Sequence, residues 1–166
     1  MSEIPTVLSP GLRAVVDALR GLDDDPLVDV LLESERAIRA AQAQRAAVVA
    51  VVEERIAALG YPVQGVADEV ALSLGISPRS ADHLLGDSLA LVRRPLVWEA
   101  LSEGWIDLPK ARLIVEMLAD FTGGIPRCDM ERDAIAYGRN HTTHQLRQHL
   151  LRLTCDGDPG EHLRKK

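Results

Sequence analysis

A stretch of 33 residues from Leu27 to Leu59 contains no glycine and no proline, and it limits the fold more than any other feature of the sequence. Alanine, leucine and arginine, which favour helices, are frequent in it, so we expect one long α-helix that stops at Gly60 and Pro62. At 1.5 Å per residue this helix is about 50 Å long. Its apolar side has the three-and-four spacing of a helix face, with Leu27, Leu31, Ser34, Ile38, Ala41, Ala47, Val48, Val51, Val52 and Ile56.

A helix of this length has two ordinary uses. It is either a spine for shorter helices of the same chain or one strand of a coiled coil with a partner, including a homodimer. In the second case, a charge placed in the apolar seam, as in Val48→Asp or Val51→Asp, is costly. The candidates for the contact surface are Leu31, Ile38, Val48, Val51 and Val52.

The remaining segments predict short helices joined by tight turns. A short amphipathic helix is expected to begin near Ser9, where Ser-Pro supplies a cap and a proline in the first turn, and an acidic loop at 23–26 separates it from the long helix. Asp107 and either Thr142 or Thr143 are the expected caps of later helices. Because only 3% of the 166 residues are aromatic, the core must be built from Leu, Val, Ile and Ala. The expected fold is therefore all-α.

We interpret residues 1–155 as a single helical domain and residues 156–166 as a polar tail or the start of a linker. No apolar run is long enough to span a bilayer, and residues 1–11 lack the basic and apolar regions of a signal peptide. These features predict a cytoplasmic protein without a membrane partner. Cys128 and Cys155 are isolated in the sequence and are expected to be reduced thiols.

The segment VADEVALSLGISPRSADHLL matches a helix-turn-helix, with Gly75 in the turn and Ser77 as the cap of the second helix. Val70, Ala71, Ile76, Ala81 and Leu84 are expected to pack between its helices and the core. The candidates for DNA contact on the second helix are Ser77, Arg79, Ser80 and His83. The acidic side chains of the same hairpin, which would repel phosphates, are Asp68, Glu69, Asp82 and Asp87. A hairpin used only for packing is the alternative.

The net charge of −6 argues against a strong sequence-independent affinity for nucleic acid. The C-terminal stretch differs, because residues 127–166 carry eight basic and six acidic side chains, and residues 139–155 carry no acid. This stretch is the best electrostatic candidate for a nucleic-acid face, with a solvated helix face as the alternative. The further basic candidates for DNA contact are Lys110, Arg112, Arg139, Arg147 and Arg152.

No pattern in the sequence predicts catalysis, a cofactor, a small-molecule substrate or a metal site. Local nucleophile and metalloprotease motifs such as GxSxG and HExxH are missing from the sequence. The possible zinc ligands have poor spacing for a tetrahedral site, and they are His141, His144, His149, Cys155 and His162. Trp98 and Trp105 are expected to be buried, with each indole N–H donating to a carbonyl.

Several segments together resemble the DUF222 region of actinobacterial 13E12-repeat proteins, most of which end in an HNH nuclease module. The resemblance covers about residues 27–165, and its most specific parts are GISPRSAD and the A-L-x-x-G-x-I-x-x-x-K-A-R pattern at Ala100 to Arg112. It implies a helical region associated with a DNA-cutting enzyme, whose nuclease module is not in these 166 residues. Two hypotheses follow: a DNA-associated targeting or regulatory domain, and a protein-interaction or dimerisation module that makes no DNA contact.

Overall fold

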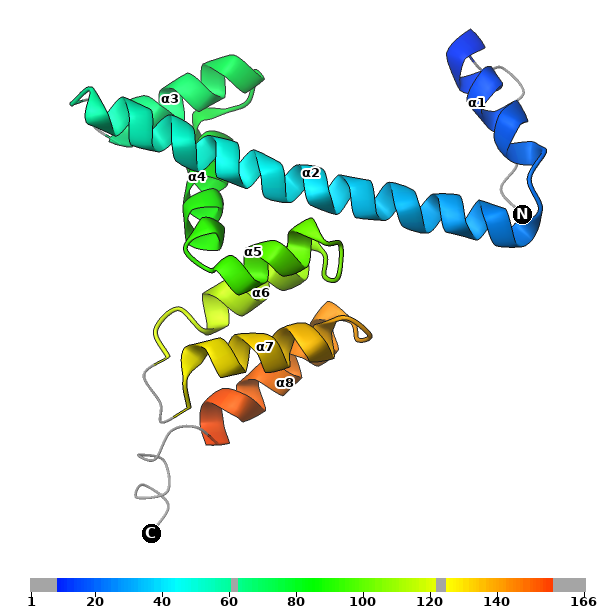
Figure 1. The fold of residues 1–166 in the computed structure, drawn as a ribbon. Helices are drawn as coiled ribbons and strands as arrows, with labels where there is room; N and C mark the ends of the chain where they lie inside the picture. Colours follow the sequence, from blue (N-terminus) through cyan, green and yellow to red (C-terminus); the bar gives the residue numbers. More distant parts are fainter. Residues whose placement is uncertain (1–8, 61–62, 122–124, 157–166) are drawn as a thin grey trace. The chain divides into compact units, whose positions relative to one another are not determined.

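The computed structural model describes residues 9–60, 63–121 and 125–156, and in these ranges all regular secondary structure is α-helical. The predicted all-α class is therefore confirmed. The helices are α1 (Pro10–Arg20), α2 (Asp24–Ala58), α3 (Val63–Leu74), α4 (Pro78–Val92), α5 (Pro95–Ser102), α6 (Leu108–Met117), α7 (Arg127–Gly138) and α8 (Thr143–Asp156) (Figure 1). The predicted tail beyond Asp156 lies outside the described residues.

Polar side chains cap the N-termini of several helices, as predicted. The Ser9 Oγ accepts a hydrogen bond from the Leu12 N–H over 3.3 Å, and the Asp107 carboxylate accepts one from the Lys110 N–H over 2.9 Å. Each contact satisfies a backbone donor that the first helical turn leaves without a partner. At α8 the cap is Thr142 rather than Thr143, and its backbone N–H donates to the Gln145 side chain over 2.9 Å.

The long helix is confirmed, but α2 begins at Asp24, three residues before the predicted start. Asp24 and Asp25 occupy its first turn, where acidic side chains interact favourably with the positive end of the helix dipole. Most of the predicted acidic loop is therefore helical. The first turn also accepts Pro26, because the backbone nitrogens of that turn need no partner within the helix.

Contacts within the chain divide it into two compact units, Met1–Glu35 and Arg36–Lys166. The first contains α1 and the beginning of α2, and none of its described side chains is buried. The second contains the rest of α2 and the helices that follow. Its main core lies among α4 to α8, and its largest fully buried side chains include Leu101, Ile106, Ile114, Leu118, Met130, Leu146 and Leu150.

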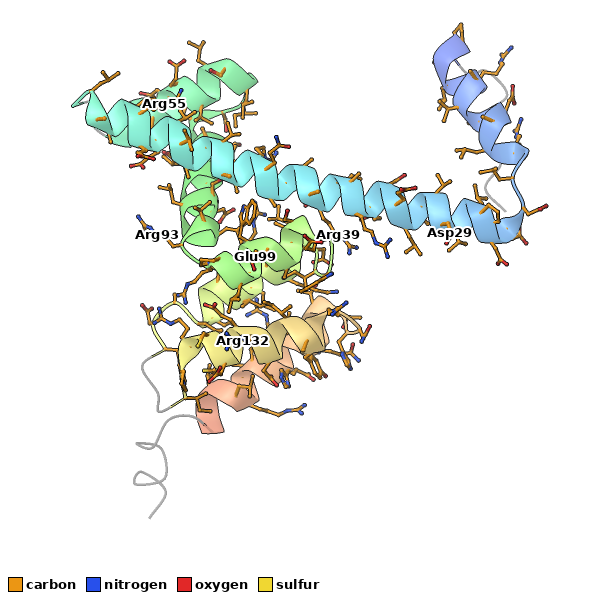
Figure 2. All side chains as sticks on the ribbon, viewed as in Figure 1. Asp29, Arg39, Arg55, Arg93, Glu99 and Arg132 are labelled. Carbon is orange, nitrogen blue, oxygen red and sulfur yellow. The ribbon has the colours of Figure 1, made fainter. Side chains whose placement is uncertain are left out.

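Within the second unit, α2 approaches the core through small side chains. Ala43 and Ala46 are buried, and the indole N–H of Trp98 donates to the Ala43 carbonyl over 2.9 Å, as predicted for this tryptophan. Arg39 reaches the turn between α5 and α6 (Figure 2), where its guanidinium donates to the Gly104 carbonyl over 2.8 Å. This part of α2 is therefore a spine for the shorter helices.

The spine packs through a different face from the one that the apolar spacing predicted. The α2 residues buried in the core are Ala43, Ala46 and Val49, whereas the exposed fractions of Ile38 and Val48 are 51% and 54%. The prediction was wrong at Ile38 and Val48, whereas Val52 and Ile56 of the predicted face pack against a buried cluster that includes Val49. The consequence is a line of apolar side chains on α2 that this core leaves exposed.

The helix-turn-helix arrangement of α3 and α4 is confirmed in its packing. Val70, Ala71 and Ala81 form a small buried cluster, and Ile76 and Leu84 pack against it. Gly75 has a φ of +63°, a conformation that strains residues with a side chain, which explains a glycine in the turn.

One buried ion pair joins separate parts of the second unit. The Arg94 guanidinium lies 2.9 Å from the Glu131 carboxylate, and the side chains are only 13% and 8% exposed. A second nitrogen of Arg94 donates to the Leu118 carbonyl over 3.2 Å. Arg94 thus connects the turn after α4 to α7 and to the end of α6.

Candidate interaction and nucleic-acid surfaces

The predicted DNA-contact residues of α4 are exposed but lie among acids. Ser77 caps the helix, with 3.1 Å between its Oγ and the Ser80 backbone nitrogen, and the two hydroxyl oxygens are 2.8 Å apart. Both hydroxyls already have a hydrogen-bond partner within the hairpin. The exposed ionisable residues of the hairpin are the basic Arg79 and His83 and the acidic Asp68, Glu69 and Asp82. The surface of this hairpin is thus net acidic.

The two basic candidates on α6 are paired with acids of the same chain. The Lys110 amine lies 3.6 Å from the Asp107 carboxylate, and its side chain is only 15% exposed. Arg112 lies 2.8 Å from the Asp87 carboxylate at a small apolar pocket of ≈ 380 Å³ between α4 and α6. These pairs reduce the charge available for phosphates, so α6 contributes little to a nucleic-acid face.

The exposed side of α8 carries basic side chains and, over residues 143–154, no acid. Arg147 and Arg152 are both exposed there, and the exposed residues between and beside them are His144, Gln145, Gln148 and Leu151. Arg147 and Arg152 are five residues apart and therefore differ by about 140° around the helix axis, so they lie toward opposite edges of the exposed side of α8.

Trp105 is exposed, which contradicts its predicted burial. Its exposed fraction is 45%, and the guanidinium carbon of Arg139 lies 4.6 Å from the centre of its ring system. The turn between α5 and α6 places Trp105 at the edge of a groove of ≈ 480 Å³ that Glu99 on α5 and Arg132 on α7 also line (Figure 2). No local sequence signal distinguished Trp105 from the partly buried Trp98, because the difference depends on which side of the turn meets α7.

Three rings stack between α7 and α8. Tyr137 lies between His141 and His149, with ring centroids 3.8 and 4.1 Å apart, and His149 also contacts the Asp133 carboxylate at 2.5 Å. Two of the imidazoles considered as zinc ligands are thus held by aromatic and polar contacts. In the described ranges, no three His, Cys, Asp or Glu side chains lie close enough to hold a metal ion. The Cys155 side chain and His162 lie outside the described residues.

The described residues of the N-terminal unit carry eight exposed large apolar side chains. Those between Pro10 and Glu35 with at least 38% exposure are Leu12, Val15, Leu22, Leu27, Val28, Val30, Leu31 and Leu32. Of the predicted interaction residues, Leu31, Ile38, Val48 and Val51 are exposed, while Val52 is half-buried against the cluster around Val49 and Val66. The structure thus leaves most of the predicted contact residues accessible.

No described helix combines the length and the apolar character that a bilayer crossing requires. Comparisons of the chain with family models, with curated proteins and with solved structures found no match.

Proposed function

We propose that the chain is a non-catalytic protein-interaction module, and that residues 10–35 bind an amphipathic helix of a partner protein. One observation carries this proposal: the described residues of the N-terminal unit bury no side chain, and eight of their large apolar side chains are exposed. Short helices without packed apolar faces are marginally stable in water. A partner that covers these side chains would supply the missing core.

The amount of exposed apolar surface fits a binding role. At roughly 80 Å² for each half-exposed Leu or Val, the eight side chains together expose about 600 Å² of apolar surface, a sum within the range of the largest apolar patches of typical monomers. Patches of this size on soluble proteins commonly mark interaction sites. The amphipathic pattern of α1 indicates a helix as the complementary shape.

The charge of this segment defines the chemistry of the partner. Residues 9–35 contain seven acidic and two basic side chains, so their net charge is −5. The acidic side chains are Asp17, Asp23, Asp24, Asp25, Asp29, Glu33 and Glu35, and the basic ones are Arg13 and Arg20. A partner helix with an apolar face and Lys or Arg on its flanks is complementary to both features, whereas an acidic helix would be repelled.

Fluorescence anisotropy with two labelled helical peptides tests the proposal. One peptide of 18 residues combines leucine with lysine, and the other has glutamate at every lysine position. We expect the chain to bind the lysine peptide and not the glutamate peptide. Replacing Val28 and Leu31 together by serine should weaken binding about 10-fold or more, because each apolar side chain contributes roughly 1.5–3 kcal/mol when fully buried.

The matched control is Leu72→Ser, which removes an apolar side chain that is 80% exposed on α3, outside the N-terminal unit. It should leave the affinity for the lysine peptide unchanged. Equal binding of the two peptides would contradict the proposed charge selectivity. An unchanged affinity after the double serine substitution would contradict the apolar docking surface.

A second candidate function, DNA association, is favoured by the acid-free exposed side of α8 with Arg147 and Arg152. The resemblance to a region that accompanies HNH nuclease modules supports the same function by analogy. Anisotropy with a labelled DNA duplex at two salt concentrations tests it. Arg147→Glu with Arg152→Glu should weaken binding and reduce its salt dependence, whereas Arg93→Glu, an exposed charge reversal after α4, is the control. Binding that is unaffected by the double reversal would exclude this face.

A further inference from the structure

The groove beside Trp105 has walls of opposite charge. Glu99 and Glu103 line it from the side of α5, and Arg132 and Arg139 line it from α7; Figure 2 labels Glu99 and Arg132. All four of these residues are exposed, and Trp105 at the edge of the groove is 45% exposed. The remaining lining residues are apolar, namely Leu96, Ile135 and Ala136. The groove therefore has two acidic groups on one wall and two basic groups on the other.

The charged residues follow the same order along both walls. The helices α5 and α7 pack against one another and run in the same direction (Figure 1). Arg139 and Glu103 lie near the Trp105 end of the groove, because the Arg139 guanidinium carbon is 4.6 Å from the centre of the Trp105 ring and Glu103 precedes Trp105 by two residues. Glu99 lies about one helical turn before Glu103, and Arg132 lies about two turns before Arg139. Each wall thus has one charge near Trp105 and one farther away.

We propose that two copies of the chain pair face to face through this groove, related by a two-fold axis that runs along it. Such an axis exchanges the two sides of the groove and leaves the position along the groove unchanged, so the α5 wall of one copy faces the α7 wall of the other. Glu99 then faces the partner's Arg132, and Glu103 faces the partner's Arg139. The symmetry repeats both contacts, so every charged side chain of the groove faces one of opposite sign.

The other face-to-face arrangement is unfavourable. A two-fold axis across the groove would place each wall opposite the same wall of the partner, so that carboxylates would face carboxylates and guanidinium groups would face guanidinium groups. Like charges at close range repel and lower the affinity. A uniformly acidic or uniformly basic partner would likewise be repelled by one of the two walls. A second copy of the chain is therefore complementary to the groove, and in one arrangement only.

The contacts that the two arginines make within their own chain leave them able to bind a partner. Arg132 lies 2.8 Å from the Asp129 carboxylate, but both side chains are more than half exposed, so this ion pair is weak. A guanidinium has five N–H donors and can bind a second carboxylate at the same time. Arg139 contacts the ring of Trp105, and this contact does not occupy its N–H donors.

The surface available is that of a weak specific dimer. The exposed parts of the four charged side chains and of Trp105 amount to about 500 Å² per copy, so a pair buries about 1,000 Å², at the low end for specific interfaces. Tryptophan and arginine are the residues that most often dominate the binding energy of an interface. This pairing uses α5 and α7, and it does not depend on the docking of a basic helix at residues 10–35.

Charge-reversal variants of the full chain test the pairing. Glu99→Arg puts an arginine opposite the partner's Arg132, and Arg132→Glu puts a glutamate opposite the partner's Glu99. Each variant alone should associate at least about 10-fold more weakly than the unmodified chain. An equal mixture of the two variants should associate about as strongly as the unmodified chain, because a mixed pair again joins opposite charges. The reversals change the net charge of −6 to −4 and −8, so general attraction between the two variants does not explain this recovery.

Sedimentation velocity over a concentration series measures the association. At about 100 µM the unmodified chain should exceed the 18.1 kDa mass of one copy. The control Glu54→Arg, an equal charge reversal at an exposed position of α2, should behave like the unmodified chain, and circular dichroism checks that every variant is folded.

Three results would overturn the proposal. A monomeric unmodified chain at this concentration excludes the dimer. Single reversals that associate as strongly as the unmodified chain exclude this groove as the interface. A mixture that stays as dissociated as its two components contradicts the proposed facing of the α5 and α7 walls.

Discussion

Gly104 occupies the closest approach between α2 and the turn that joins α5 to α6. A Cβ atom added there would lie 2.9 Å from the Arg36 Cγ, 3.2 Å from its Cβ and 3.3 Å from its Cα. The Gly104 backbone also has a φ of +72°, in the left-handed region. Gly104→Ala therefore introduces both a steric contact with α2 and backbone strain.

The two effects set the expected magnitude. A side chain in the left-handed region costs roughly 1–2 kcal/mol, and overpacking against the Arg36 backbone costs a further 1–3 kcal/mol or so. The loss of chain entropy in the unfolded state offsets about 0.4–1 kcal/mol of this cost. Gly104→Ala should lower the free energy of unfolding by about 2–4 kcal/mol. For a chain of this size the melting temperature should fall by roughly 5–12 °C.

Denaturant unfolding followed by circular dichroism measures this change. Gly75→Ala is the matched control, because Gly75 also has a positive φ, +63°, but an added Cβ would meet no atom within 4 Å. The control should show the cost of strain alone, about 1 kcal/mol. The difference between the two variants then reports the contact with Arg36. Equal losses in both variants would refute the close approach of α2 to Gly104.

Three further substitutions test contacts of the second unit by the same unfolding assay. Glu131→Ala leaves the buried Arg94 without its carboxylate and should cost about 3–5 kcal/mol, whereas a cost below about 1 kcal/mol would show that the pair is solvated. Trp98→Phe removes the hydrogen bond to the Ala43 carbonyl and should cost about 0.5–1.5 kcal/mol, and an unchanged stability would contradict this bond. Thr142→Ala removes the cap of α8 and should cost about 1 kcal/mol, with no loss expected if another group caps the helix.

Local sequence chemistry determined where most helices begin. Ser9, Ser77 and Asp107 cap helices as predicted, because a capping bond joins residues only three apart in the chain. The long helix α2 was also predictable from the sequence, since the absence of glycine and proline over 33 residues is a local property. The packing of Val70 and Ala81 was predictable for the same reason, because α3 and α4 are adjacent in the sequence and joined by a short turn.

Only the tertiary structure decided which surfaces remain available for binding. The apolar spacing of α2 did not reveal that Ala43 and Ala46 would face the core while Ile38 and Val48 stay exposed, because that choice depends on the shape of α5 and α6. Charge counting likewise included Lys110 and Arg112 among free basic residues, yet their acidic partners neutralise them. Helix formation depends on near neighbours in the chain, whereas the exposure of a side chain and the pairing of a charge depend on residues that only folding brings together.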